Sequence, residues 1–340
     1  MTFGGLSAVS SLTSTRKAIA LSINEGDQTN PSPKPELSED GISTIAFVKT
    51  TDRAYGVNRA LELLDINPVE NKTVFIKPNF NSADPTPGST HIDVLRALVL
   101  ALKKMGASSI TIGDRSGMGS TRAVMQDIGV FDLADELGFS TVVFDVLGSD
   151  DWVFMQSPDS HWKNGFYLSK PCLDADVVIQ ACCLKTHQYG GQFTMSLKNS
   201  VGMVAKRVPG NSTDYMTELH KSVFQRELIA EINSAYSPGL IVLDGIEAFV
   251  SGGPAKGSRV DSEVVLAGTD RIAIDAVGVA LLRYHGNRTN VSKGPIFEQD
   301  QIARAVDLGL GVQSPEKIRF LSDDDSASYA KQIKEILLTG

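Results

Sequence analysis

Cysteine is scarce in this 340-residue sequence, which has only Cys172, Cys182 and Cys183. Adjacent cysteines rarely pair, and three thiols cannot supply the four thiolates of a typical iron–sulfur cluster. The sequence therefore predicts a chain without disulfides and without a built-in cluster. A reducing compartment suits such a chain, so we expect a cytoplasmic protein.

Long apolar runs and an excess of positive charge are also lacking. No stretch approaches the ~18 consecutive apolar residues of a membrane span, so we expect no membrane partner. The 40 acidic residues outnumber the 32 basic ones and give a net charge of −8, which argues against a nucleic-acid partner. Any anion must be held locally, and we expect a small anionic molecule as ligand. Nothing in the sequence indicates the oligomeric state.

Residues 1–42 are rich in Ser, Thr, Gly, Pro and Asn, which predicts a flexible tail. The apolar run from Ala18 to Ile23 is shorter than the about 7–15 residues of a secretory signal. Arg16-Lys17 partly matches a twin-arginine signal, so export is the alternative to a cytoplasmic location. We expect the fold to begin near Ser43.

From Thr44 onward, β-branched apolar runs alternate with helical periods, which predicts an α/β fold. The expected architecture is a mainly parallel, doubly wound sheet flanked by helices, with a mixed sheet in the second half as the alternative. Residues 43–322 form this unit, as one body or as lobes near 43–150 and 170–322, and a C-terminal helix covers 323–340. Expected strands are Thr44–Val48, Thr73–Lys77, Ser109–Ile112, Ser140–Val143, Val177–Leu184, Leu240–Leu243, Glu263–Gly268 and Lys317–Leu321.

The expected helices have apolar residues at three- and four-residue spacing. They are Gly56–Leu64, His91–Met105, Arg122–Ile128, Phe131–Leu137, Val223–Tyr236, Arg271–Tyr284 and Phe297–Leu308. Thr90 is the expected N-cap of the second helix, and Gly106 follows its end. The alternation fails around Asp150–Tyr167 and Lys206–Thr217, which predicts surface loops near a site.

Ligands of open α/β sheets bind beyond the carboxyl ends of the strands, so polar residues placed there are the candidates. The strand before Pro78 delivers Lys77 and Asn79, and a buried lysine needs either a ligand or a carboxylate partner. The glycine-rich turn after the next strand offers backbone N–H groups to an anion, or it is a plain connection. Its candidate residues are Asp114, Ser116, Gly117 and Gly119.

The richest segment follows the apolar strand that ends at Leu184. It contains Lys185 and His187, then Lys198 and Asn199, and so supplies fixed positive charge beside a titratable base. We predict that His187, Lys185 and Lys198 form the catalytic centre and that Asn199 contacts the ligand. The structural alternative is a histidine that only makes hydrogen bonds.

Two carboxylates complete the candidate set. Asp244 could hold a divalent metal, orient a lysine or cap a turn, and Asp270 could hold the same metal or cap a helix with Asp275 nearby. His91 lies at a helix start and is a candidate ligand contact, whereas His161, His220 and His285 lie among polar residues expected to be exposed. The sequence has neither a His-Glu-x-x-His motif nor a Gly-x-Ser-x-Gly elbow, which argues against a zinc site and an α/β-hydrolase.

Taken together, these motifs resemble those of the prokaryotic domain-of-unknown-function family 362, from about Ile45 to Leu321. Many members of that family carry iron–sulfur motifs, which implies redox work, but this sequence lacks cysteines at cluster spacing. The motifs are Lys77-Pro78-Asn79, Thr90-His91, Gly113-Asp114, Lys185-Thr186-His187, Leu197-Lys198-Asn199, Asp244-Gly245 with Gly252-Gly253-Pro254, and Gly268-Thr269-Asp270 with Asp275.

At fewer positions the sequence is similar to the amino-terminal domain of nickel-pincer lactate racemases. There a histidine precedes a glycine pair and a lysine that anchors the cofactor, and His187, Gly190-Gly191 and Lys198 repeat that order. This similarity implies acid–base roles for His91 and His187 and cofactor attachment at Lys198.

Two functions fit these residues. The first is an enzyme that acts on a small carboxylate or phosphate, with lysines that hold the anion and His187 as the proton carrier. The second is a non-catalytic ligand- or cofactor-binding accessory protein of a redox or metal-maturation pathway, which needs the lysines but not His187. The sequence does not name a substrate, and it leaves open whether the chain is an enzyme.

Overall fold

The computed structural model describes Ser22–Ile23 and residues 40–190 and 192–340, and within them a nine-stranded sheet forms the centre of the fold. The sheet order is β12-β2-β11-β10-β8-β3-β4-β5, with β9 paired to β8. In the described part of the sheet, all strands except β9 and β11 run parallel. The strands are β2 (Ser43–Lys49), β3 (Thr73–Pro78), β4 (Ser109–Asp114), β5 (Ser140–Val143), β8 (Val177–His187), β9 (Gln192–Thr194), β10 (Pro238–Gly252), β11 (Gly257–Gly268) and β12 (Ile318–Leu321).

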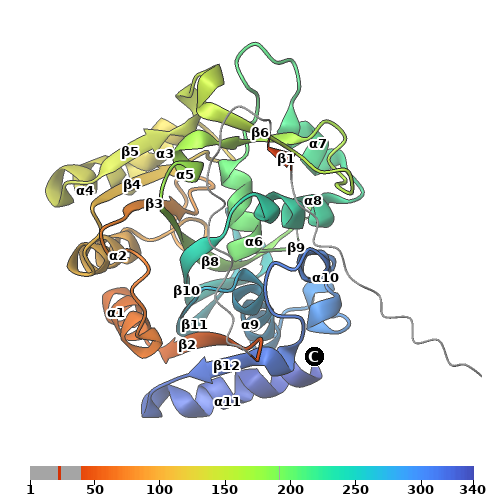
Figure 1. Ribbon diagram of the computed structural model, residues 1–340. Helices are drawn as coiled ribbons and strands as arrows, with labels where there is room; N and C mark the ends of the chain where they lie inside the picture. The colour runs from red at the N-terminus through yellow and green to blue at the C-terminus, as the bar shows by residue number, and fades with distance from the viewer. Residues whose placement is uncertain (1–21, 24–39, 191) are drawn as a thin grey trace, which may run out of the picture.

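Helices cover both faces of this sheet, as the doubly wound prediction requires. Figure 1 shows α1 and α2 on one side and α9 and α10 on the other. The first face packs against α1 (Arg53–Leu64), α2 (Ile92–Lys104), α3 (Thr121–Ile128) and α4 (Val130–Leu137). The second face packs against α9 (Arg271–Tyr284), α10 (Asp300–Asp307) and α11 (Asp324–Thr339). The α/β class and the mixed second half are therefore confirmed.

A third core lies under a small antiparallel sheet of β1 (Ser22–Ile23), β6 (Trp152–Gln156) and β7 (Phe166–Ser169). The prediction of plain surface loops over Asp150–Tyr167 is thus wrong. The aromatic residues that interrupt the sequence periodicity there, such as Trp152 and Phe166, are buried in this core. The remaining helices of this region are α5 (Lys170–Leu173), α6 (Ser196–Asn199), α7 (Tyr215–Lys221) and α8 (Gln225–Ile232).

Strand and helix ends differ from the predictions mainly where polar residues continue an apolar run. β8 extends to His187 because its last residues pair with β9 in an antiparallel hairpin. The N-cap of α2 is His91 and not Thr90, since the His91 side chain accepts from the Asp93 N–H at 3.2 Å. The Thr90 hydroxyl instead joins β3 to β8, with Asn79 N at 2.8 Å and Ala181 O at 2.9 Å.

Most of the predicted tail lies outside the described residues, apart from the two residues of β1 and residues 40–42. Within the described part of the chain, no helix combines the length and apolar character needed to cross a bilayer.

Candidate anion-binding site

A cavity of about 210 Å³ opens beyond the carboxyl ends of β3, β4 and β8. Parallel strands end at the same edge of a sheet, so residues far apart in sequence converge there. The cavity brings together eight of the predicted site residues, which are Lys77, Asn79, Asp114, Gly117, Lys185, His187, Lys198 and Asn199.

Lys77 is neutralised by an acid within the cavity wall. Its Nζ lies 2.7 Å from Asp114 Oδ1, and both side chains are almost fully buried. Asp114 also accepts from the backbone N–H groups of Phe80 at 2.8 Å and Arg115 at 2.7 Å. The pair therefore locks the ends of β3 and β4 together, and Lys77 contributes little net charge to the cavity.

Gly202 makes room for this ion pair. A Cβ atom at Gly202 would lie 2.4 Å from Asp114 Oδ1 and 2.6 Å from Lys77 Nζ. We expect Gly202→Ala to lower the free energy of unfolding by about 1–3 kcal/mol, as overpacking of a buried site does. Urea titration measures the loss. Gly148→Ala is the matched control, because the nearest atom to a Cβ there is 3.4 Å away, and equal stability of both variants would contradict the prediction.

Lys185 is held by neutral oxygen atoms. Its Nζ donates to Asn79 Oδ1 at 2.7 Å and to the Gly88 carbonyl, and no carboxylate in the described residues forms an ion pair with it. Burial lowers the pKa of this ammonium group to about 8, although nearby thiols and Asp114 oppose the shift. The positive charge of Lys185 therefore remains available to an anion in the cavity.

Lys198 is a cation of the cavity lining whose ammonium group has no protein partner in the described part of the chain. It lies on the short helix α6, is partly exposed to the cavity, and has neither a hydrogen bond nor an ion pair within the described residues. Desolvation lowers its pKa to about 7, and the charges of Lys185 and Arg115 act in the same direction. A lysine with this pKa changes between its charged and neutral forms near neutral pH, whereas an ordinary lysine stays charged there.

Asp275, on α9, positions the helix that carries Lys198. Its carboxylate accepts from the Ser196 N–H at 2.7 Å and from the Leu197 N–H at 3.2 Å, at the start of α6. Burial raises the pKa of Asp275 to about 7, although these two hydrogen bonds oppose the shift. Asp275 thus holds the start of α6 in place, a function that goes beyond its own helix α9.

His187 is a neutral base in a positive environment. Burial, together with the charges of Lys198 and Lys185, lowers its pKa far below the usual range. Its Nδ1 atom is buried and has no hydrogen-bond partner among the described residues. A bound ligand would be able to supply that partner.

The sequence did not identify several residues that line the same cavity. Arg115, Lys206, Met216 and His220 all reach it, and the last two come from α7. His220 is exposed, as predicted, yet it faces the ligand space. No local signal marks these residues, because the segment around 206–220 folds back over the sheet from a distant position in sequence.

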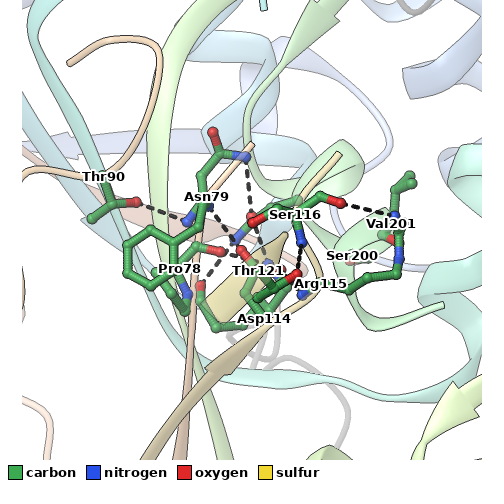
Figure 2. Close-up of polar contacts among 12 residues, drawn as sticks. Pro78, Asn79, Thr90, Asp114, Arg115, Ser116, Thr121, Ser200 and Val201 are labelled. Atoms are coloured by element: carbon green, nitrogen blue, oxygen red, sulfur yellow. Dashed lines mark hydrogen bonds and ion pairs between the residues drawn. The ribbon is translucent and has the colours of Figure 1, made fainter. Parts of the chain in front are cut away.

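Three predicted site residues lie outside the cavity wall. His91 caps α2, with its Nδ1 atom 3.5 Å from Asp93 Oδ2, and Gly119 lies in an exposed part of the turn. The backbone N–H of Ser116 donates to Thr121 Oγ1 at 2.8 Å (Figure 2). Arg115 extends from the same turn to the Val201 carbonyl at 2.7 Å. The turn is therefore closed by its own contacts, and beyond Arg115 only Gly117 and Met118 of this stretch line the cavity.

The two carboxylates predicted as metal ligands also lie apart from the cavity lining. Asp244 Oδ2 accepts from Arg53 Nε at 2.8 Å, and Asp270 caps α9 through the N–H groups of Ile272 and Ala273. Within the described ranges, no group of three or more His, Cys, Asp or Glu side chains is arranged to hold a metal ion. Both residues have structural partners, and the metal role stays a prediction.

Comparison with known proteins assigns the family. Residues 74–280, more than half of the chain, match the family described as "Domain of unknown function (DUF362)". The chain belongs to this family. A curated relative is the thylakoid-associated protein sll1697 of Synechocystis sp., which is 31% identical over 215 residues, or 62% of this chain and 63% of that protein. The aligned part of the chain thus spans less than two thirds of the relative's length.

Among solved structures, the lactate racemase apoprotein from Thermoanaerobacterium thermosaccharolyticum is similar to this DUF362 chain. The match covers 88% of both chains with 15% sequence identity and a TM-score of 0.42. At that score the likeness carries no argument about the site, and the roles implied for His91, His187 and Lys198 stay predictions.

The cysteines of this DUF362 chain do not fit an iron–sulfur cluster. All three are buried, and burial raises the pKa of Cys172 to about 12, that of Cys183 to about 11 and that of Cys182 well above its usual value. A cluster typically takes four thiolate ligands, and this chain has only three cysteines, two of which are adjacent.

Proposed function

We propose that the cavity binds a small carboxylate or phosphate and that Lys198, Lys185 and His187 transfer a proton on the bound molecule. The observation that carries this proposal is the environment of Lys198, a cation that faces the cavity without an acid partner among the described residues. An anionic ligand would be the missing partner. Uncompensated charge of this kind is costly to bury and is typical of binding sites.

The charge of the cavity supports this proposal. Its lining includes five cationic side chains, namely those of Lys77, Arg115, Lys185, Lys198 and Lys206, against the single carboxylate of Asp114. The whole chain carries a net charge of −8, so positive charge is concentrated here against the overall balance. Fields of this sign attract anions and stabilise negative charge that develops during a reaction.

The pKa values support proton transfer. Lys198 has a pKa of about 7 in the empty cavity, and a bound anion raises that pKa, so Lys198 is protonated in the complex at neutral pH and can act as the general acid. His187 is neutral because of burial and the neighbouring lysines. A bound anion offsets the charges of those lysines and raises the pKa of His187, so the base becomes active when substrate binds.

A hydrogen-exchange experiment tests the chemical step even though the substrate is unidentified. The protein is incubated in D2O with a panel of carboxylates that carry a C–H bond beside a carbonyl group, and NMR follows loss of that proton signal. We expect exchange with the wild-type protein, and we expect His187→Ala and Lys198→Ala to lower its rate at least tenfold. Lys331→Ala, at an exposed position on α11, is the matched control.

The same panel separates catalysis from simple binding. Calorimetry with each compound measures affinity, and His187→Ala should leave affinity mostly intact while it abolishes exchange. Binding that depends on Lys198 without exchange of any compound would favour the non-catalytic accessory function. Absence of binding of every carboxylate in the panel and of inorganic phosphate would contradict both.

A further inference from the structure

A second, larger cavity of about 880 Å³ adjoins the anion cavity. The two cavities share the lining residues Arg115, Gly117, Lys206, Met216 and His220. A ligand in the inner cavity can therefore extend past these residues into the outer one. The inner cavity, at about 210 Å³, has room for a small anionic group, whereas the outer cavity has room for a ring system.

Arg115, at the junction, is fixed and positively charged. The Arg115 guanidinium donates to the carbonyl oxygens of Val204 at 2.8 Å and Val201 at 2.7 Å, and it approaches Met216 Sδ at 3.1 Å. On α7, His220 Nδ1 lies 2.6 Å from the Met216 carbonyl oxygen. In the described residues Arg115 has no carboxylate in an ion pair, so its charge favours an anion that lies between the two cavities.

The outer cavity combines an apolar wall with lysines. Phe144, Leu147 and Trp152 line one part of it, and the Trp152 Nε1 atom is buried without a hydrogen-bond partner in the described residues. Lys206 and Lys221 line another part, and neither forms an ion pair among those residues, whereas Arg207 is neutralised by Asp214 at 2.8 Å. Apolar surface beside free cations suits a flat ring attached to an anionic group.

We propose that the natural ligand is elongated, with a phosphate or carboxylate head in the inner cavity and an aromatic ring in the outer cavity. This inference rests on the proposed function for the anionic head group, and it adds the chemical class of the rest of the ligand. The ring contributes affinity by burying the apolar surface that Leu147, Pro209 and Met216 leave exposed in the outer cavity. The head group contributes charge-assisted contacts with the lysines.

Calorimetry with inorganic phosphate, phenyl phosphate and 1-naphthyl phosphate tests this class. We expect each added ring to raise affinity, with 1-naphthyl phosphate binding at least tenfold more tightly than inorganic phosphate. Thr217→Trp places an indole group in the outer cavity, which Thr217 lines from an exposed position on α7 without reaching the inner cavity. This variant should bind inorganic phosphate like the wild type and lose the preference for naphthyl phosphate.

Thr339→Trp, at an exposed position near the end of α11, is the matched control and should retain the preference. Equal affinity of the wild type for all three phosphates would overturn the inference while leaving the anion site intact. A Thr217→Trp variant that keeps the full preference would also overturn it. Failure of the wild type to bind any of the three phosphates or any carboxylate of the exchange panel would instead contradict the proposed function itself.

Discussion

Sulfate should bind most tightly below pH 7 and lose affinity at least about tenfold per pH unit above it. Lys198 has a pKa of about 7 and Lys185 of about 8 in the empty cavity, and a bound anion raises both by favouring the charged forms. About one pH unit below 7 both lysines are almost fully protonated, so affinity no longer changes with pH. Above pH 7, a deprotonated lysine must take up a proton when sulfate binds. Affinity therefore falls with rising pH until the pH reaches the raised pKa of the lysines in the complex. Sulfate keeps its charge over this range, so the slope reports the protein.

Two Lys198 variants test the assignment of this pH dependence. Lys198→Arg keeps the positive charge at all accessible pH values, so it should bind sulfate with the step near pH 7 removed. Lys198→Ala should bind about 10- to 100-fold more weakly at pH 6, the usual effect of losing a hydrogen bond to a charged group. Calorimetry in buffers of different ionisation enthalpy measures the proton uptake directly. An unchanged pH profile in Lys198→Arg would assign the titration to another group.

The convergence of Lys77, Lys185, His187 and Lys198 was predictable from the sequence. Each of Lys77, Lys185 and His187 lies at the carboxyl end of an apolar strand, and parallel strands must end at one edge of the sheet. Their individual electrostatic states were not predictable. Lys77 is neutralised by Asp114 and Lys185 is not, a difference that depends on 2.7 Å contacts between separate strands.

The residues that sequence reasoning missed come from segments without a periodic pattern. The sequence marks Arg115 only as part of a turn, whereas its side chain crosses to the segment around Val201 and becomes part of the cavity wall. His220 follows a stretch rich in polar residues, and nothing local distinguishes it from a solvent-exposed histidine. Their placement is determined by tertiary packing of α7 and the 206–214 segment over the sheet, which leaves no signature in nearby residues.

Asp270 illustrates the opposite case, in which a predicted ligand residue has a structural function. Its carboxylate caps α9 through the N–H groups of Ile272 at 2.8 Å and Ala273 at 3.0 Å. It also binds the N–H of Val312 at 2.7 Å, which ties α9 to the segment before β12. We expect Asp270→Ala to lower the free energy of unfolding by about 3–5 kcal/mol, because each buried N–H left unpaired costs about 1–3 kcal/mol. Urea denaturation measures this change.

Graded variants and a chelator make this expectation specific to capping. Asp270→Asn keeps one oxygen for Ile272 and Ala273 but turns an amide group toward the Val312 N–H, so its loss should be smaller than that of Asp270→Ala. Asp52→Ala removes the exposed cap of α1, with one bond of 3.0 Å to the Tyr55 N–H, and should cost about 0.5–2 kcal/mol. Dialysis of the wild type against EDTA should leave its unfolding midpoint unchanged. A midpoint that falls on chelation to the value of Asp270→Ala would instead show that Asp270 stabilises the fold through a bound metal ion.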